Sequence, residues 1–191
     1  MATEGRIDAG LLRQLMSGRL SWDVIEKILR APKTLDRFAQ YMAAVAPDIR
    51  VTGKPLLRLN EYLYIVGHDT GIPTVQCGRC GYDFGDYRVN WKLNSDVYVR
   101  RSKEEFLEIY RYEEVIPEEN YAEIREYYCP GCYTLLCVEC VPPGYPPIFE
   151  FLPDVEGFYR DVLGQAIPGG AGGSPPADLT YEAVKEHFPR E

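Results

Sequence analysis

Two cysteine pairs constrain this chain more than any other feature of its sequence. Each has the Cys-x-x-Cys spacing: Cys77 with Cys80, and Cys129 with Cys132. This spacing lets two thiolates from one tight turn reach the same ion, and the glycine or proline in each turn helps the backbone reverse. Two such turns supply four sulfur ligands, which is the closed tetrahedral set of a structural metal site. A closed site leaves no position for substrate, so the pattern predicts a metal but no particular activity.

A third pair, Cys137 and Cys140, exceeds what one ion needs. It has no glycine or proline between its cysteines and lies in a run typical of a strand. Side chains alternate along a strand, so the two thiols would face opposite sides. We therefore expect two small buried hydrophobic side chains here, with a redox dithiol or an additional metal site as the alternative.

Zinc is the first expectation for the metal, because four thiolates at this spacing are typical of structural zinc. The same ligand set also fits iron in a rubredoxin-like centre or an iron–sulfur cluster. Under either metal, a binding free energy of about 10–16 kcal/mol is available to hold the fold together.

Composition excludes several classes of protein. The chain has 191 residues and a net charge of −8, and this acidic balance would repel a phosphate backbone, so we expect no nucleic-acid partner. It contains no apolar run near the ~18 residues that a membrane helix needs. The polar N-terminus, residues 1–10, lacks a signal core, and metal-binding cysteine pairs are typical of a reducing compartment. We therefore expect a cytoplasmic protein without a membrane partner.

The first part of the chain, residues 1–46, is predicted to be an N-terminal helical arm. Apolar residues recur at helical spacing in three stretches, beginning near Ile7, after Ser21 and after Thr34, and Pro32 and Pro47 interrupt the pattern. Ser21 and Thr34 are the expected N-caps. The apolar stripes are expected to form a thin helical core or to dock on a larger partner.

Residues 47–163 are predicted to form a zinc-ribbon-like antiparallel β domain with an inserted helix, so the fold class is α+β. Strand patterns occupy 55–76, 86–99, 121–128 and 134–138, with one turn near Asn60-Glu61 and another at Asn94-Ser95-Asp96. Between the cysteine pairs, Ser102 and Glu105 form a capping box that starts a helix. A short helix is expected from Asp154 to Leu163.

Residues 164–191 are predicted to be a flexible Gly/Pro linker followed by a C-terminal helix. The linker lacks the Lys-Ser/Thr of a phosphate-binding loop, so no nucleotide site is expected there.

No catalytic or cofactor-binding residue is predicted in this chain. The sequence contains no Gly-x-Ser-x-Gly, His-Glu-x-x-His or complete Walker motif. His68 is the one histidine considered as a catalytic or metal-binding residue, but four thiolates already complete a site. The paired carboxylates Glu104-Glu105 and Glu118-Glu119 are expected to be solvated. These features favour a binding or structural component.

Three longer motifs resemble the small gamma subunit of acetone carboxylase and the related acetophenone carboxylase. They are Asn90-Trp91-Lys92-Leu93, Ile124 to Cys132, and Pro153 to Tyr159, in this order. The resemblance covers about residues 11–168, leaving out the C-terminal tail, and the family pattern does not include Cys137 and Cys140.

The resemblance implies a cytoplasmic heterohexamer with two copies each of three subunits. It implies two larger hydantoinase-like subunits, alpha and beta, which use ATP and bicarbonate to convert acetone into acetoacetate, or acetophenone into benzoylacetate. Phosphorylated enolate and carboxy-phosphate intermediates would form there, with ATP and a divalent metal such as Mn in those partners. The gamma subunit would carry Zn on Cys77, Cys80, Cys129 and Cys132.

The sequence therefore predicts a non-catalytic, zinc-binding structural subunit of an ATP-dependent ketone carboxylase, a ligase. Two alternatives remain at this point: a free-standing rubredoxin-like electron carrier and an acidic zinc-ribbon adaptor without enzymatic partners.

Overall fold

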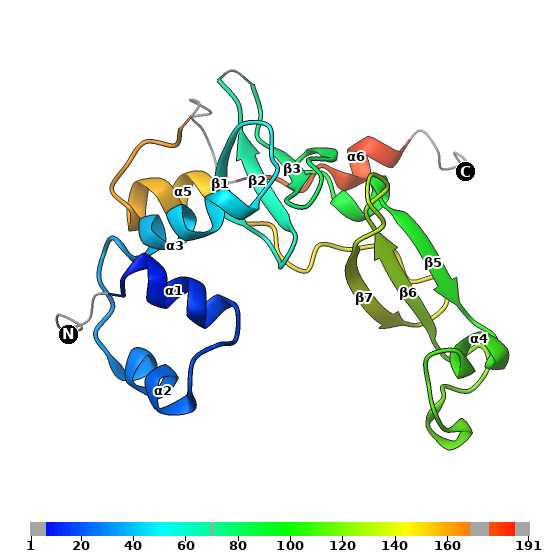
Figure 1. Ribbon diagram of the computed structural model, residues 1–191. Coiled ribbons are helices and arrows are strands. Elements are labelled where there is room, and N and C mark those ends of the chain that lie inside the picture. Colours follow the sequence, from blue (N-terminus) through cyan, green and yellow to red (C-terminus); the bar gives the residue numbers. More distant parts are fainter. Residues whose placement is uncertain (1–6, 70, 169–175, 186–191) are drawn as a thin grey trace. The chain divides into compact units, whose positions relative to one another are not determined.

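The computed structural model describes residues 7–69, 71–168 and 176–185 (Figure 1). The chain separates into two compact units, Met1–Ile49 and Arg50–Glu191. Within the described residues, no helix combines the length and the apolar character needed to cross a bilayer.

The first unit consists of the helices α1 (Ala9–Met16), α2 (Trp22–Arg30) and α3 (Arg37–Val45), followed by the short η1 (Ala46–Asp48). The three predicted helices are therefore confirmed, and α1 contacts α3. Asp8 caps α1, since its carboxylate accepts from the amide of Leu11 at 2.8 Å. The expected cap at Thr34 is wrong, because residues 34–36 form a turn first and Asp36 takes the N-cap position.

The second unit begins with a four-stranded antiparallel sheet in the order β1-β2-β3-β4. Its strands are β1 (Lys54–Arg58), β2 (Leu63–Gly67), β3 (Thr74–Cys77) and β4 (Asp83–Asp86). The predicted turn near Asn60 is confirmed: its side-chain oxygen accepts from the amides of Tyr62 and Leu63, both at 2.9 Å. Pro55 lies in the edge strand β1, where it removes no interior ladder bond.

A second, three-stranded antiparallel sheet follows in the order β5-β6-β7. It contains β5 (Asp96–Arg100), β6 (Glu123–Tyr128) and β7 (Leu135–Val141). Between β5 and β6 lie α4 (Lys103–Leu107) and η3 (Glu113–Val115). The predicted capping box of Ser102 and Glu105 is present at the start of α4. The α+β, zinc-ribbon-like class with an inserted helix is therefore confirmed.

The expectation of strands across residues 86–99 is only partly right. Residues between β4 and β5 form the short helix η2 (Trp91–Asn94), because the Asn90 side chain accepts from the amide of Lys92 at 3.1 Å and starts a turn. Three further short helices follow, namely α5 (Val155–Gly157), η4 (Phe158–Val162) and α6 (Thr180–Val184). Asp154 caps α5 as expected.

The structure describes only part of the predicted C-terminal tail, residues 164–191. Residues 169–175 of the predicted linker and 186–191 of the predicted C-terminal helix lie outside the described residues. Near α6, the amide of Leu179 donates to the carbonyl of Arg88 at 2.9 Å, and the Thr180 hydroxyl accepts from the amide of Asn90 at 3.0 Å. The division into an arm of residues 1–46, a domain of 47–163 and a tail of 164–191 stays a prediction.

One buried cluster of side chains draws on both sheets of the second unit. Its members are Leu63, Val75, Cys77, Phe84, Trp91, Tyr127, Cys129 and Leu136. Edge-to-face aromatic contacts run through it from Tyr82 to Phe84, then to Trp91 and on to Tyr127, with ring centroids 5.0–6.1 Å apart. The core therefore lies directly beside two of the predicted metal ligands.

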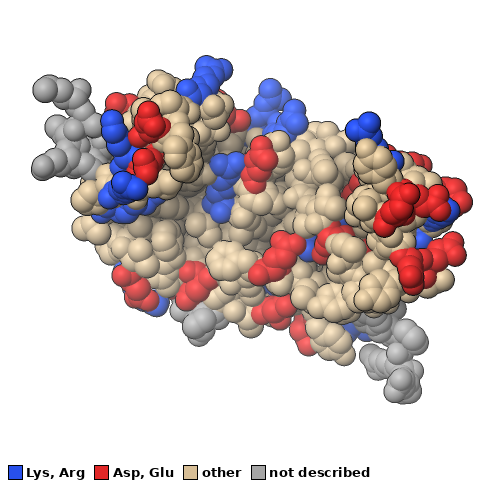
Figure 2. All heavy atoms as spheres, turned by 90° about the horizontal axis from the view of Figure 1, so that it is seen from below, with Lys and Arg blue, Asp and Glu red and all other residues tan. Residues whose placement is uncertain are grey.

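Charge is unevenly spread over the face that Figure 2 shows. Acidic side chains gather at the end that carries α4 and the residues after it, with neutral surface between them.

Candidate metal centre

The four predicted ligands lie in two hairpin turns, one from each sheet. Cys77 ends β3 and Cys80 lies in the turn to β4, while Cys129 directly follows β6 and Cys132 lies in the turn to β7. The centre therefore bridges segments that are far apart in sequence.

The backbone of the two turns is equivalent. In the first, the Cys77 amide donates to Tyr82 at 2.9 Å; in the second, the Cys129 amide donates to Thr134 at 3.0 Å. The amides of Gly81 and Tyr133 likewise donate to the carbonyls of Cys77 and Cys129, at 2.7 and 2.8 Å. Gly81 has a φ of +82° and Tyr133 a φ of +54°. Each turn thus closes through one residue in the left-handed region, which glycine adopts readily and tyrosine only at a cost.

The sulfur atoms form a compact set. All four ligand atoms lie within 4.8 Å of one another, with Cys77 Sγ 3.9 Å from Cys132 Sγ and Cys80 Sγ 3.5 Å from Cys129 Sγ. A tetrahedral zinc ion with bonds of about 2.3 Å places its sulfur ligands ~3.8 Å apart. The cysteines are free, and these separations far exceed the ~2.05 Å of a disulfide. The four cysteines could therefore hold a metal ion such as zinc.

Close approach of the two turns depends on small residues. A Cβ on Gly131 would lie 3.1 Å from both Cys80 Sγ and the Cβ of Tyr82, and a Cβ on Gly78 would lie 2.6 Å from the Tyr64 ring. Glycine at these positions lets each turn approach its neighbours. The site thus has the shape of a cradle that a larger residue would fill.

Electrostatics favours a cation within this set. Burial raises the pKa of the Cys77 and Cys129 thiols, both of which are inaccessible to solvent. Burial also acts to raise the pKa of Cys132, but hydrogen bonds from Thr134 outweigh it and bring the value down to about 7. Four thiolates this close repel one another, so their full ionisation requires a compensating positive ion. Thiolate ligands select zinc or iron over hard cations such as magnesium.

The third cysteine pair takes no part in this centre. Cys137 lies opposite Tyr127 in the sheet and Cys140 lies opposite Ile124, so the two thiols lie on opposite faces of β7, as predicted. Cys137 Sγ lies 3.2 Å from a Glu150 oxygen. The expectation of two buried side chains is wrong, because Cys140 is exposed and Cys137 is only half-buried.

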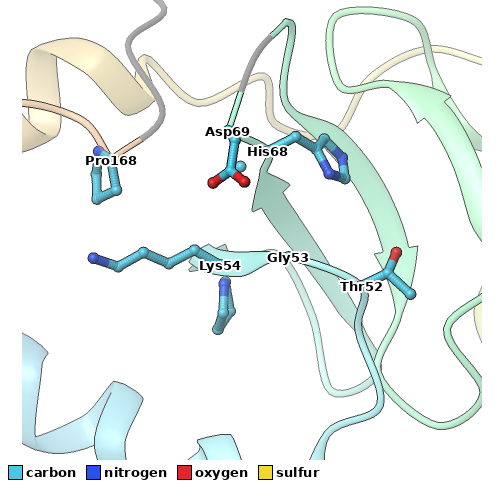
Figure 3. Close-up of a pocket in the computed structure, with 8 residues that line it drawn as sticks. Thr52, Gly53, Lys54, His68, Asp69 and Pro168 are labelled. Atoms are coloured by element: carbon cyan, nitrogen blue, oxygen red, sulfur yellow. The ribbon is translucent and has the colours of Figure 1, made fainter.

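His68 lines a separate cleft, with a volume of about 720 Å³, in the second unit (Figure 3). Its Nε2 atom lies 3.0 Å from the Thr74 hydroxyl. Lys54 extends toward Pro168, whereas the His68 ring lies on the other side of the cleft and Asp69 points into the hollow. These side chains do not converge on one point, and among the described residues the only cluster with metal-ligand geometry is the four cysteines.

Sequence reasoning missed a buried ionic network beside the core. Lys92, with a side chain only 2% exposed, donates to Glu139 and Glu150, both at 2.8 Å. Arg125 pairs with Glu139 and Glu123 on the same side of the sheet. The signal was the alternation of Glu123 and Arg125 along β6, which places opposite charges on one face. The paired carboxylates that were expected to be solvated are exposed, except for Glu105, whose side chain closes the capping box.

The fold and the four-cysteine centre define a class: a small α+β protein with a zinc-ribbon-like arrangement of two cysteine turns. Comparison with known proteins gives the family. The family model described as "Acetone carboxylase gamma subunit" matches residues 49–163, a range that contains all four cysteines. The chain belongs to this family, which confirms the resemblance seen in its sequence motifs.

Two curated relatives agree with this assignment. The acetone carboxylase gamma subunit of Xanthobacter autotrophicus (strain ATCC BAA-1158 / Py2) is 38% identical over 155 residues, which cover 81% of this chain and 91% of the relative. The acetophenone carboxylase beta subunit of Aromatoleum aromaticum (strain DSM 19018 / LMG 30748 / EbN1) is 31% identical over 101 residues, covering 52% of this chain and 76% of the relative.

Proposed function

We propose that this chain is the small, zinc-binding, non-catalytic subunit of an ATP-dependent ketone carboxylase. The observation that carries the proposal is family membership over a range that includes both cysteine turns, together with their convergence within 4.8 Å. The relatives are named as subunits of acetone and acetophenone carboxylases. The reaction is the ATP- and bicarbonate-dependent carboxylation of a ketone, acetone or acetophenone.

Zinc has a structural role in this proposal. Two ligands come from the β3–β4 turn and two from the β6–β7 turn, so the ion fastens one sheet to the other beside the shared core. The binding free energy of structural zinc, about 10–16 kcal/mol, equals or exceeds the 5–15 kcal/mol stability of a typical domain. Loss of the ion is therefore expected to unfold the second unit.

The chemistry is assigned to the partners. Four protein thiolates fill a tetrahedral zinc, which then has no open position for water or substrate. ATP and a divalent metal such as Mn would bind in two larger, hydantoinase-like subunits, with two copies of each chain in a cytoplasmic heterohexamer. This chain would stabilise that assembly.

Native purification tests the proposal. The chain is isolated gently from its host, co-eluting proteins are identified by mass spectrometry, and the fraction is assayed for ATP hydrolysis that depends on both a ketone and bicarbonate. Two co-eluting large subunits with that activity are the expected result. A small protein that elutes alone would refute it, and its metal would then separate the electron carrier, which contains iron, from the zinc adaptor.

A further inference from the structure

The loop between α4 and β6, taken together with the last residue of α4 as residues 107–121, exposes several large apolar side chains. None of its residues is buried. Its exposed large apolar side chains are Leu107, Ile109, Tyr112, Val115 and Tyr121, and Val115 is 60% and Tyr121 77% accessible. Several exposed apolar side chains within one short stretch of chain are typical of an interaction site.

Few contacts tie this loop to the rest of the second unit. Its backbone hydrogen bonds are local: the amide of Val115 donates to the carbonyl of Tyr112 at 3.4 Å, and that of Tyr121 to the carbonyl of Glu118 at 3.1 Å. Its ion pairs join Glu108 to Arg100 and Glu113 to Lys103, which both lie just before the loop. Apart from the single turn of η3, the loop has no regular structure, and long loops of this kind are uncommon in compact domains unless they are functional or disordered.

The charge of the loop restricts what could cover it. It contains Glu108, Glu113, Glu114, Glu118 and Glu119 but only one basic residue, Arg111. Glu114, Glu118 and Glu119 form no ion pair with any described residue. Figure 2 shows acidic side chains gathered at the α4 end of this unit, with neutral surface and a few basic side chains among them. The loop thus combines an apolar centre with an unpaired acidic rim.

A second copy of this chain is a poor occupant. A two-fold contact places the same patch of each copy against itself, so the unpaired Glu114, Glu118 and Glu119 of one copy would face those of the other. Like charges across an interface oppose binding, whereas complementary charges favour it. The loop therefore fits a different chain whose apolar surface is rimmed by lysine or arginine.

We propose that residues 107–121 are the docking element by which this chain binds a large carboxylase subunit through an apolar surface with a basic rim. This inference rests on the proposed function, which supplies a larger partner. It adds the place of contact and the charge of the partner's surface. Val115 and Tyr112 form the centre of the contact, and the unpaired glutamates form its rim.

The test uses the full chain co-expressed with both large subunits of its own complex. Val115→Glu places a charge at the centre of the loop, and Val115→Ile keeps that centre apolar. Val162→Glu is the matched control elsewhere, since Val162 is 64% exposed and, like Val115, ends a short helix. Affinity is measured by titrating each purified variant into the large subunits, and zinc content confirms that each variant is folded.

Val115→Glu is expected to weaken binding at least about 30-fold, as for a central interface residue, while both controls stay within about threefold of the wild type. If Val115→Glu loses zinc, Glu118→Lys/Glu119→Lys replaces it. That variant should weaken binding about tenfold at low salt and less at high salt.

Three results would overturn the docking assignment. Val115→Glu could bind like the wild type, Val162→Glu could lose binding equally, or the isolated chain could be a dimer that Val115→Glu dissociates. If instead the wild-type chain does not bind the large subunits at all, the proposed function itself fails, so the two failures are distinguishable.

Discussion

Gly81 and Tyr133 close the two cysteine turns in the same way. Replacing the glycine in the first turn and introducing a glycine in the second should therefore have opposite effects on stability. In Gly81→Ala, the new Cβ would lie 2.6 Å from the Arg50 carbonyl oxygen, at a φ of +82°. The left-handed conformation costs a non-glycine residue about 1–2 kcal/mol. Displacing a backbone atom adds about 1–3 kcal/mol, and the stiffer unfolded chain returns ~0.4–1 kcal/mol. The expected net loss of stability is about 1–4.5 kcal/mol.

Tyr133→Gly removes the same left-handed penalty from the second turn. Tyr133 is exposed, so little burial is lost. The relief of about 1–2 kcal/mol is offset by the ~0.5–1 kcal/mol that glycine costs through its flexible unfolded state. The net effect should lie between no change and a stabilisation of about 1 kcal/mol.

Urea unfolding of both variants at one fixed free zinc concentration measures this contrast, with the wild type as reference. A Gly81→Ala protein within about 0.5 kcal/mol of the wild type would refute the reasoning. So would a Tyr133→Gly protein that loses more than ~1.5 kcal/mol, because the turns would then not be equivalent.

Further predictions concern the ionic network and the cradle of the metal. Lys92→Met removes the buried ammonium that pairs with Glu139 and should cost about 3 kcal/mol in urea unfolding, whereas Lys103→Met, at an exposed pair, should leave the stability close to that of the wild type. Equal losses would show that the network is not special. Burial acts to raise the pKa of Glu139, but hydrogen bonds from Lys92 and a neighbouring tyrosine outweigh it and lower the value. The folded pKa thus lies below the unfolded value of about 4.3, so this carboxylate contributes stability above that pH and loses it as pH falls through the folded value. Below about pH 4.3, the unfolding midpoint of Lys92→Met should fall less steeply with decreasing pH than that of the wild type. An equal slope in the two proteins would contradict this account. Gly131→Val crowds Cys80 and should lower zinc affinity about tenfold in competition with a chelator; an unchanged affinity would show that the turn can move aside.

Local signals made the cysteine turns and several elements predictable. The spacing of Cys77 and Cys80 determines a turn geometry within a few residues, and the same holds for Ser102 and Glu105 in the capping box. The helical periodicity before Pro47 and the turn at Asn60 are also local features. The sequence therefore indicated the four cysteines and the α+β class without any long-range information.

Features that depend on distant segments were not predictable in the same way. Lys92 is buried only because Glu139 and Glu150 approach it from segments far along the chain. Residues 91–94 turn into η2 rather than a strand because Asn90 bonds locally, which competes with the ladder. Whether Cys140 is exposed depends on which segments cover its face of β7, and that arrangement is set by pairing over long separations.

Metal stoichiometry tests the central claim most directly. The purified chain is analysed for zinc and iron per polypeptide, beside Cys129→Ser and Cys140→Ser. The account predicts one colourless zinc in the wild type and in Cys140→Ser, with metal and solubility lost together in Cys129→Ser. A soluble Cys129→Ser protein that keeps its metal, or a Cys140→Ser protein that loses it, would contradict the four-cysteine centre.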